Sequence, residues 1–278
     1  MIVFLNGQFV PEAEAVVSVF DRSFLYGDGL FETARIHAGK PFLWDRHLAR
    51  LRRGAALLRL TIPLSDAELT TAIPQLVERN QMPEALLRLN LSRGTGPRGY
   101  STKGCEQPTV AISLHPAPTL SQPKPVRLIT ASQRLPADDL LTQIKTTNKL
   151  PHIVARAEAE AREVDDALLL STHGEVAEAT ASNLFWISGD TVFTPSTRSG
   201  ALAGITRGFV IELSQRLGLA TRETSLTPAQ LRSAHGAFLT NSVQGLVEVS
   251  SLDGQPIPSS PLTARLRAAY DEAFRAGH

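Results

Sequence analysis

The chain has little of several features, and each shortage excludes a class of protein. Cys105 is the only cysteine among 278 residues, which excludes a disulfide framework and a cysteine-rich metal site. No apolar run approaches the roughly 20 residues that a membrane-spanning helix requires. The opening residues, MIVFLNGQFV, lack the basic start and long apolar stretch of a signal peptide. We therefore expect a cytoplasmic protein that contacts no membrane and holds no metal.

Excess charge of either sign is also lacking. The 28 basic and 27 acidic residues give a formal net charge of +1, which argues against a nucleic-acid partner. Lysine is scarce too, because only five of the 28 basic residues are lysine. Two of the five lie in one short stretch, QIKTTNKLPH (143–152). A lysine differs from an arginine in that a desolvated lysine can lose its proton and become a nucleophile.

Hydrophobic periodicity predicts an α+β fold with helices and strands in both halves of the chain. Residues 1–36 read as strands and turns. Helices are expected at 44–60, 65–80, 150–163, 205–218, 227–234 and 260–277, with Ser65 and Thr227 as N-caps. Strands are expected at 85–93, 109–115, 126–132, 166–172, 176–188, 191–196 and 236–249. The proline-rich stretch PAPTLSQPKP (116–125) favours an extended linker, so we predict an N-terminal domain over 1–115 and a C-terminal domain over 126–278.

Lys145 stands in an apolar, β-branched setting, after Ile144 and before two threonines. Burial in this connection from strand to helix would disfavour the charged ammonium. A neutral lysine can form a Schiff base with an aldehyde. The alternative is an ordinary surface lysine beside a strand.

Two stretches in the second half of the chain admit a binding role. In GALAGITRGF (200–209), small residues lead into a helix whose first turn carries Ile205 and Thr206, and free N–H groups there can bind an anion. The alternative is plain capping by Thr206. In GEVAEATASNLFW (174–186), Glu178 interrupts a run of small and apolar residues, and a buried carboxylate must be paired. A protonated pyridine nitrogen is one such partner; the alternative is an edge-strand glutamate facing water.

A fourth stretch, HLARL (47–51), belongs to the first long helix. Arg46, Arg50 and Arg53 can line one face of that helix, and the alternative is a solvated basic face. Pyridoxal 5'-phosphate requires three kinds of group from a protein: a lysine to react with its aldehyde, an acid to bind its ring nitrogen, and a helix start with an arginine to bind its phosphate. The four stretches together offer all three. A sugar-phosphate or nucleotide enzyme built on GITR alone would leave Lys145 and Glu178 without roles.

These motifs resemble those of the class IV, or fold-type IV, pyridoxal-phosphate enzymes. That family contains branched-chain aminotransferases, D-amino-acid aminotransferases and aminodeoxychorismate lyase. The resemblance spans nearly the whole chain and rests on YGDGLFE, HLARL, IKTTNKL, EATASNLF and GITR, in the family's order. It implies a small N-terminal α/β domain, a larger barrel-like C-terminal domain, and a homodimer that acts on a small molecule with an amine and a carboxylate.

The resemblance also implies roles for single residues. Lys145 would bind the cofactor aldehyde and move protons, and Glu178 would bind the pyridine nitrogen. Thr33 would assist Lys145. The remaining cofactor contacts implied are Arg50, Ile205, Thr206, Asn241 and Ser242, and the substrate contacts implied are Phe31, Arg35, Arg98 and Tyr100.

Within the family, the loop RGTGPRGYS (93–101) is most like the loop of aminodeoxychorismate lyases, which form 4-aminobenzoate and pyruvate in folate biosynthesis. D-amino-acid aminotransferases have a histidine where this chain has Tyr100, and branched-chain aminotransferases lack such a loop. Thr33 and the pair Asn241 and Ser242 also resemble the lyases. Lys149 and Glu248 depart from the lyase pattern, so an aminotransferase acting on D-amino acids or branched-chain amino acids remains the alternative.

Overall fold

The computed structural model describes residues 1–119 and 123–277, and the chain divides into two compact units. The first unit comprises Met1–Pro118, Ile144–Asn148 and the chain end from Gly277; the second comprises Thr119–Gln143 and Lys149–Ala276. The predicted linker, 116–125, includes residues 120–122, which lie outside the described residues. The segment Ile144–Asn148 follows that linker in sequence and yet belongs to the first unit. The reason is that it is hydrogen-bonded to a strand of the first unit.

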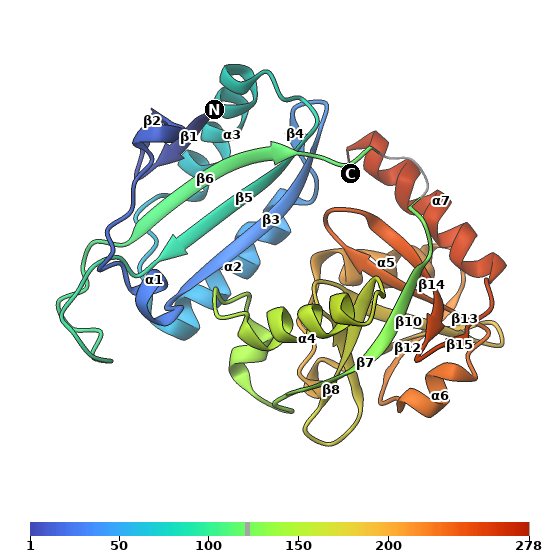
Figure 1. Cartoon of the computed structure of the whole chain (residues 1–278). Helices are drawn as coiled ribbons and strands as arrows, with labels where there is room; N and C mark the ends of the chain where they lie inside the picture. Colours follow the sequence, from blue (N-terminus) through green and yellow to red (C-terminus); the bar gives the residue numbers. More distant parts are fainter. Residues whose placement is uncertain (120–122, 278) are drawn as a thin grey trace. The chain divides into compact units, whose positions relative to one another are not determined.

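The first unit contains a six-stranded sheet with the order β2-β1-β6-β5-β3-β4 (Figure 1). Neighbouring strands pair antiparallel throughout. The strands are β1 (Ile2–Leu5), β2 (Gln8–Pro11), β3 (Gly29–His37), β4 (Lys40–Pro41), β5 (Ala85–Ser92) and β6 (Thr109–Pro116). The helices are η1 (Glu12–Glu14), α1 (Arg22–Tyr26), α2 (Trp44–Leu58) and α3 (Asp66–Asn80).

The prediction of strands and turns over residues 1–36 is wrong at α1. Asp21 caps this short helix by accepting a hydrogen bond from the Ser23 N–H (2.8 Å), and Gly27 ends it with a left-handed φ of 68°. The predicted helices at 44–60 and 65–80 are confirmed as α2 and α3. Ser65 caps α3 in a capping box with Glu68.

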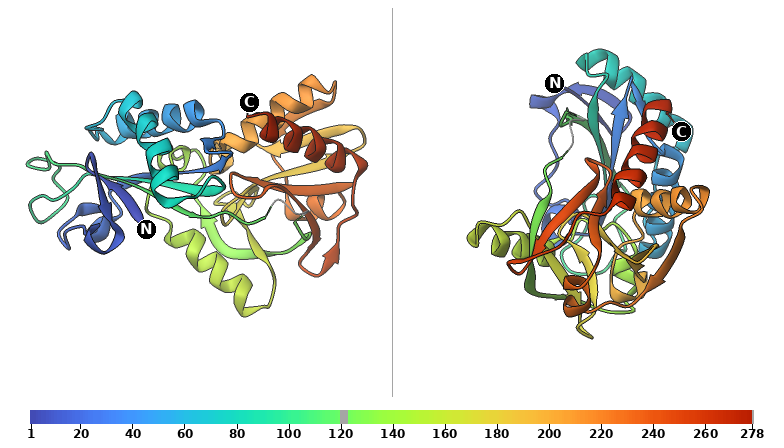
Figure 2. Two further views of the ribbon diagram at one scale, coloured as in Figure 1. Left: turned by 90° about the horizontal axis from the view of Figure 1, so that it is seen from above. Right: turned by 90° about the vertical axis from the view of Figure 1, so that its right-hand side faces the viewer.

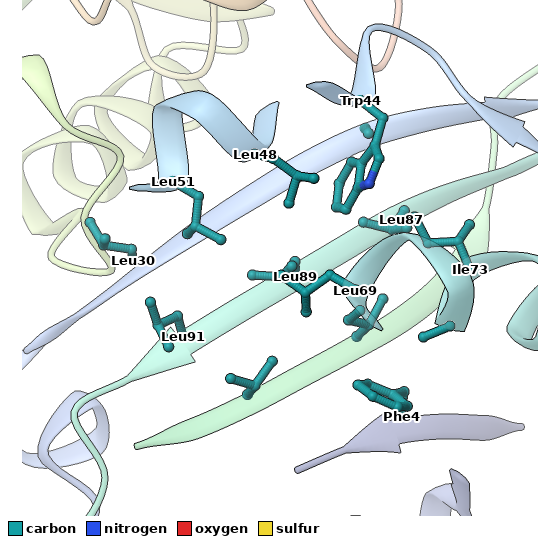
Figure 3. Close-up of a cluster of buried hydrophobic side chains, with 14 of the residues drawn as sticks. Phe4, Leu30, Trp44, Leu48, Leu51, Leu69, Ile73, Leu87, Leu89 and Leu91 are labelled. Atoms are coloured by element: carbon teal, nitrogen blue, oxygen red, sulfur yellow. The ribbon is translucent and has the colours of Figure 1, made fainter. Parts of the chain in front are cut away.

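Leucine-rich faces of α2 and α3 cover one face of the sheet and form the core of the first unit. Figure 3 shows Trp44, Leu48 and Leu51 of α2 pointing toward the strands, where Leu87, Leu89 and Leu91 of β5 lie below them. Their spacing of three and four residues places them on one side of the helix. The opposite face of β3 and β5 carries polar side chains, among them Thr33 and Arg88, together with Phe31.

The second unit is built on a nine-stranded sheet in which six strands close into a ring. Along the order β10-β13-β14-β7-β8-β9 each strand pairs with the next, and β9 pairs back with β10 through Glu178 and Asn183. This closure confirms the predicted barrel-like domain. The strands are β7 (Val126–Leu135), β8 (Asp166–Ser171), β9 (Val176–Ala179), β10 (Asn183–Ser188), β11 (Thr191–Pro195), β12 (Ala220–Thr224), β13 (Gly236–Asn241), β14 (Gly245–Leu252) and β15 (Gln255–Pro256).

Helices pack against the ring from outside. α4 lies against β7 and β8, and α7 lies beside α5 (Figure 2). Small residues allow the close approach of α4, since Ala155 and Ala159 are fully buried against the strands. The elements are η2 (Leu140–Gln143), α4 (Leu150–Ala161), η3 (Thr197–Ser199), α5 (Ile205–Arg216), α6 (Pro228–Arg232) and α7 (Pro261–Ala276). Within the described part of the chain, none of the helices combines the length and the apolar character of a membrane span.

Candidate functional site

Lys145 is held by its backbone against β3 of the first unit. The Phe31 N–H donates to the Lys145 carbonyl (3.0 Å), and the Thr147 N–H donates to the Gly29 carbonyl (3.0 Å). The half-buried side chain brings Nζ to 4.4 Å from the centroid of the Phe31 ring. The amine is therefore partly withdrawn from water beside the face of an aromatic ring, which attracts its charged form.

Phe31 and Thr33 of β3 lie on one face of the sheet, and the neighbouring strand β5 contributes a cation, Arg88, to the same face. Arg88 pairs with Thr33 across the two strands, and its guanidinium carbon lies 3.5 Å from the Phe31 ring centroid. Arg88 Nη1 lies 3.5 Å from the Thr33 hydroxyl, and Nε donates to the Asn90 side chain (3.1 Å). Burial lowers the pKa of Arg88 to about 10. No carboxylate among the described residues forms an ion pair with Arg88.

Arg88 is a candidate that sequence reasoning missed. It stands between Leu87 and Leu89, which are buried in the core, so the alternation of β5 places its side chain on the other face of the sheet. A single arginine in an otherwise apolar strand, ALLRLNLS, is the signal that could have found it. Arg88 is half-buried, and a cation in such a place that has no carboxylate partner among the described residues is suited to bind a carboxylate from a ligand.

On the helix-facing side of β3, a buried ion pair joins Glu32 to α2. Arg50 donates to Glu32 through Nε (2.8 Å) and Nη2 (2.7 Å), and His47 Nδ1 lies 2.7 Å from the same carboxylate. Burial would raise the pKa of Glu32, but the bonds and charge of Arg50, with the bond to His47, outweigh burial and lower the pKa to about 2. Burial lowers the pKa of His47, which favours a neutral ring that donates Nδ1–H. The alternative of a solvated basic face is therefore wrong for Arg50.

The remaining predicted substrate residues of the first unit lie in different surroundings. Arg35 is buried on β3, and its Nη2 donates to the Pro118 carbonyl (2.6 Å). Arg98 and Tyr100 lie in the exposed loop between β5 and β6, where Tyr100 is 87% exposed and its ring packs edge-on against Tyr26. Arg98 and Tyr100 are thus presented to solvent in the single chain.

In the second unit, Glu178 is a buried carboxylate with several donors. Its strand, β9, pairs with both β8 and β10, so the alternative of an edge-strand glutamate facing water is wrong. Oε2 accepts from the Leu202 N–H (2.9 Å) and from Asn183 Nδ2 (3.3 Å). Oε1 lies 3.0 Å from His152 Nε2. The carboxylate is fixed in orientation and is suited to accept a further hydrogen bond from a ligand.

The start of α5 has no side-chain cap, so capping by Thr206 is also wrong. The N-cap is Gly204, which has no side chain to cap the helix, and no side-chain hydrogen bond to the first N–H groups is present among the described residues. Ile205 and Thr206 are buried in the first turn. An uncapped helix start with its dipole is suited to bind a phosphate. Gly204 itself packs against Asn183, since a Cβ at position 204 would lie 1.9 Å from Asn183 Oδ1.

Asn241 and Ser242 lie where β13 turns into β14. The Asn241 side chain accepts from the Val243 N–H (2.9 Å) and the Gln244 N–H (2.8 Å), and its Nδ2 donates to the Ser182 hydroxyl (2.9 Å). The observed bonds of Asn241 therefore support the turn. Ser242 is half-buried in that turn.

Comparison with known proteins agrees with the motifs. Residues 29–252 match the family model for amino-transferase class IV. The chain is 36% identical over 276 residues to a protein of Methanocaldococcus jannaschii provisionally named a branched-chain-amino-acid aminotransferase, covering 98% of this chain and 96% of that protein. It is 31% identical over 280 residues to the aminodeoxychorismate lyase of Bacillus subtilis (99% and 95% covered) and 32% identical over 282 residues to the D-alanine aminotransferase of Bacillus licheniformis (99% and 97% covered).

Among solved structures, the fold is similar to the branched-chain amino acid aminotransferase of T.th. with pyridoxamine 5'-phosphate. The TM-score is 0.93 at 31% identity, and the match covers 100% of this chain and 95% of that one. The residues present here fit a cofactor of this kind. Lys145 offers an amine, Glu178 offers a buried acceptor, and the start of α5 offers uncapped N–H groups.

Proposed function

Since the chain belongs to the class IV aminotransferase family, whose members depend on pyridoxal 5'-phosphate, we propose that it is a 4-amino-4-deoxychorismate lyase. The products would be 4-aminobenzoate and pyruvate. The observation that supports this choice is the loop RGTGPRGYS (93–101), with Tyr100 where the D-amino-acid branch has histidine. The second candidate is an aminotransferase for D-amino acids or branched-chain amino acids. It is supported by relatives of that name that cover nearly the whole chain.

We assign the proton transfers to Lys145. When bound, pyridoxal phosphate supplies an aldehyde that condenses with amines and a ring that withdraws electrons from the carbon beside the nitrogen. The Lys145 amine takes a proton as a general base and returns it as an acid. Contact with the Phe31 ring limits where Nζ can lie, and partial burial keeps the amine from full hydration. Thr33 lies on the same face of β3 as Phe31 and is assigned to assist the proton transfer.

The cofactor contacts are assigned by the chemistry of each group. Glu178 accepts the ring N–H. The N–H groups at Ile205 and Thr206, the Ser242 hydroxyl and the Asn241 turn bind the phosphate. Arg50 adds positive charge, and its bidentate pair with Glu32 holds its guanidinium in one orientation.

The substrate carboxylates are assigned to arginines of the first unit. Arg88 is the best placed of these, because it lies against Phe31 and Thr33 and forms no ion pair with a carboxylate of the described residues. Arg35 is assigned to the same face of β3. Arg98 and Tyr100 are exposed in the single chain, and we assign them to a substrate site that is completed in a homodimer.

One preparation assayed for both reactions tests the proposal. We expect 4-aminobenzoate from 4-amino-4-deoxychorismate and little turnover of D-alanine or leucine with a 2-oxo acid. Lys145→Ala should lower the rate by about 10²–10⁴-fold, because this is the usual contribution of a positioned general acid or base. Lys149→Ala, at the other lysine of the same segment, is the matched control and should keep the rate within about threefold. Turnover of either amino acid without any aromatic product would favour the aminotransferase.

A further inference from the structure

The hydrogen bonds to Glu178 are unevenly divided between its two oxygens. Oε2 accepts two, from the Leu202 N–H and Asn183 Nδ2, whereas Oε1 has one neighbour at hydrogen-bond distance, His152 Nε2 (3.0 Å). A carboxylate offers about four acceptor positions, two on each oxygen. Among the described residues no further donor reaches this carboxylate, so the open position is on Oε1. A ring N–H that binds Glu178 would therefore share Oε1 with His152.

His152 reaches the carboxylate from the first turn of α4. An ionised carboxylate can only accept hydrogen bonds, so Nε2 is the ring nitrogen that carries the hydrogen. Its side chain is 12% exposed and that of Glu178 is 9% exposed, so water competes little for the bond. The other ring nitrogen, Nδ1, is buried and has no hydrogen-bond partner among the described residues. In the part of the chain that the structure describes, the bond to Oε1 is thus the one polar contact that orients this ring.

We propose that His152 is a positioning residue that holds Oε1 of Glu178 in place for the ring nitrogen of the cofactor. This inference rests on the proposed role of Glu178. The two bonds at Oε2 fix one end of the carboxylate, and the bond from His152 fixes the other. Without it, the carboxylate is held through Oε2 alone, so its tilt is less restricted and the ring N–H would meet an acceptor of more variable direction.

Substitutions at position 152 can remove the bond to Glu178 without breaking another hydrogen bond of the described residues. His152→Leu removes the donor, keeps a side chain of similar bulk, and breaks no other hydrogen bond, because Nδ1 has none among the described residues. His152→Gln keeps an N–H donor at about the same reach and should behave as the wild type. His173→Leu is the matched control, because His173 is an exposed histidine of the same unit, in the hairpin before β9.

The test compares how the apoproteins bind pyridoxal phosphate and its 1-deaza analogue, in which the ring nitrogen is replaced by C–H. We measure both dissociation constants by equilibrium dialysis. Wild type, His152→Gln and His173→Leu should prefer the natural cofactor. In His152→Leu the dissociation constant for pyridoxal phosphate should rise about tenfold, as expected for one hydrogen bond to a charged group. Its dissociation constant for the deaza analogue should stay within about twofold.

The ratio of the two constants separates the possible failures. If His152→Leu keeps the wild-type ratio of the two dissociation constants, whether or not both ligands bind more weakly, the positioning role of His152 is wrong while the role of Glu178 stands. If the wild type itself does not distinguish the two ligands, the proposed role of Glu178 fails and the inference fails with it. His152→Ala provides a second variant without a donor, so the comparison does not depend on the folding of His152→Leu.

Discussion

At the scale of single residues, the strongest constraint beside the candidate site is the buried pair of Glu32 and Arg50. Both oxygens of the carboxylate are occupied, since Arg50 binds it through two nitrogens and His47 adds a third contact. Such a pair is costly to break, because one partner alone leaves an uncompensated charge in a dry interior. We therefore read the cluster as a support that fixes Arg50 and the strand that carries Phe31.

The matching prediction concerns Glu32→Gln. This change keeps the shape but leaves Arg50 without its counter-charge, so the free energy of unfolding should fall by about 3 kcal/mol in urea titrations. Glu160→Gln is the control: Glu160 pairs with Arg156 on the surface and is 63% exposed, so the loss should be below about 1 kcal/mol. Equal losses for the two variants would contradict the reading.

The pH dependence of the same variant gives a second measurement. The pKa of Glu32 lies at about 2 in the folded protein, below its ordinary 4.5, so the unfolded chain binds this proton more readily. The contribution is therefore complete above pH 4.5 and is lost as the pH falls toward 2. The difference in free energy of unfolding between wild type and Glu32→Gln should shrink as the pH falls from 4.5 to 2. A difference that stays constant would show that Glu32 is not the group responsible.

At the scale of elements, the start of α5 depends on contact between Gly204 and Asn183. Asn183 Nδ2 donates to the Leu202 carbonyl (2.8 Å) and to Glu178, so one side chain connects β10, the turn before α5 and the carboxylate. A methyl group at position 204 would meet Asn183 Oδ1 at 1.9 Å. The glycine is required there by this close approach, since its φ of −66° suits any residue.

We expect Gly204→Ala to displace Asn183, lowering stability by about 1–3 kcal/mol as overpacking does, and to weaken cofactor binding. Gly208→Ala is the matched control in the same helix, because a Cβ there meets nothing within 4 Å. Alanine at position 208 should raise stability by up to about 1 kcal/mol, since it favours the helix over glycine. Urea titrations and the bound cofactor per chain measure both effects. Similar behaviour of the two variants would show that the contact with Asn183 is unimportant.

At the scale of the whole molecule, we propose that the exposed apolar segment at 16–25 is covered by a second copy of the chain. The segment has six large hydrophobic side chains in contact with solvent: Val16, Val17, Val19, Phe20, Phe24 and Leu25. Such an apolar cluster on a single chain marks an association surface. The homodimer expected from the family resemblance is the partner that fits it.

Light scattering on the wild type should therefore give about twice the chain mass of 30.1 kDa. Replacing Phe20 and Phe24, which are 67% and 75% exposed, by serine should shift the protein toward the single-chain mass. Leu57→Ser is the control, because Leu57 is an exposed apolar residue of α2 outside the segment. A wild-type protein of single-chain mass, or a dimer that survives the double substitution, would refute this assignment.

The sequence by itself determined the identity of the family and most of the local elements, although it missed the short helix α1. Helical spacing placed α2 and α3 to within two residues, and the Ser65 capping box was readable because a cap depends on neighbours three residues apart. The motifs around Lys145 and Glu178 were sufficient to name the family and its cofactor, and the match over residues 29–252 confirms both.

Only the tertiary structure decided which distant segments meet. Four contacts link residues that are far apart in the chain or lie on different elements. Residues 144–148 pair with β3, and β9 pairs with β10. Arg88 lies beside Phe31, and His152 bonds to Glu178. Periodicity reports which side of an element faces the core, and it does not report what lies across from it. The partners of each predicted residue are set by the packing of distant segments, which only the tertiary structure contains.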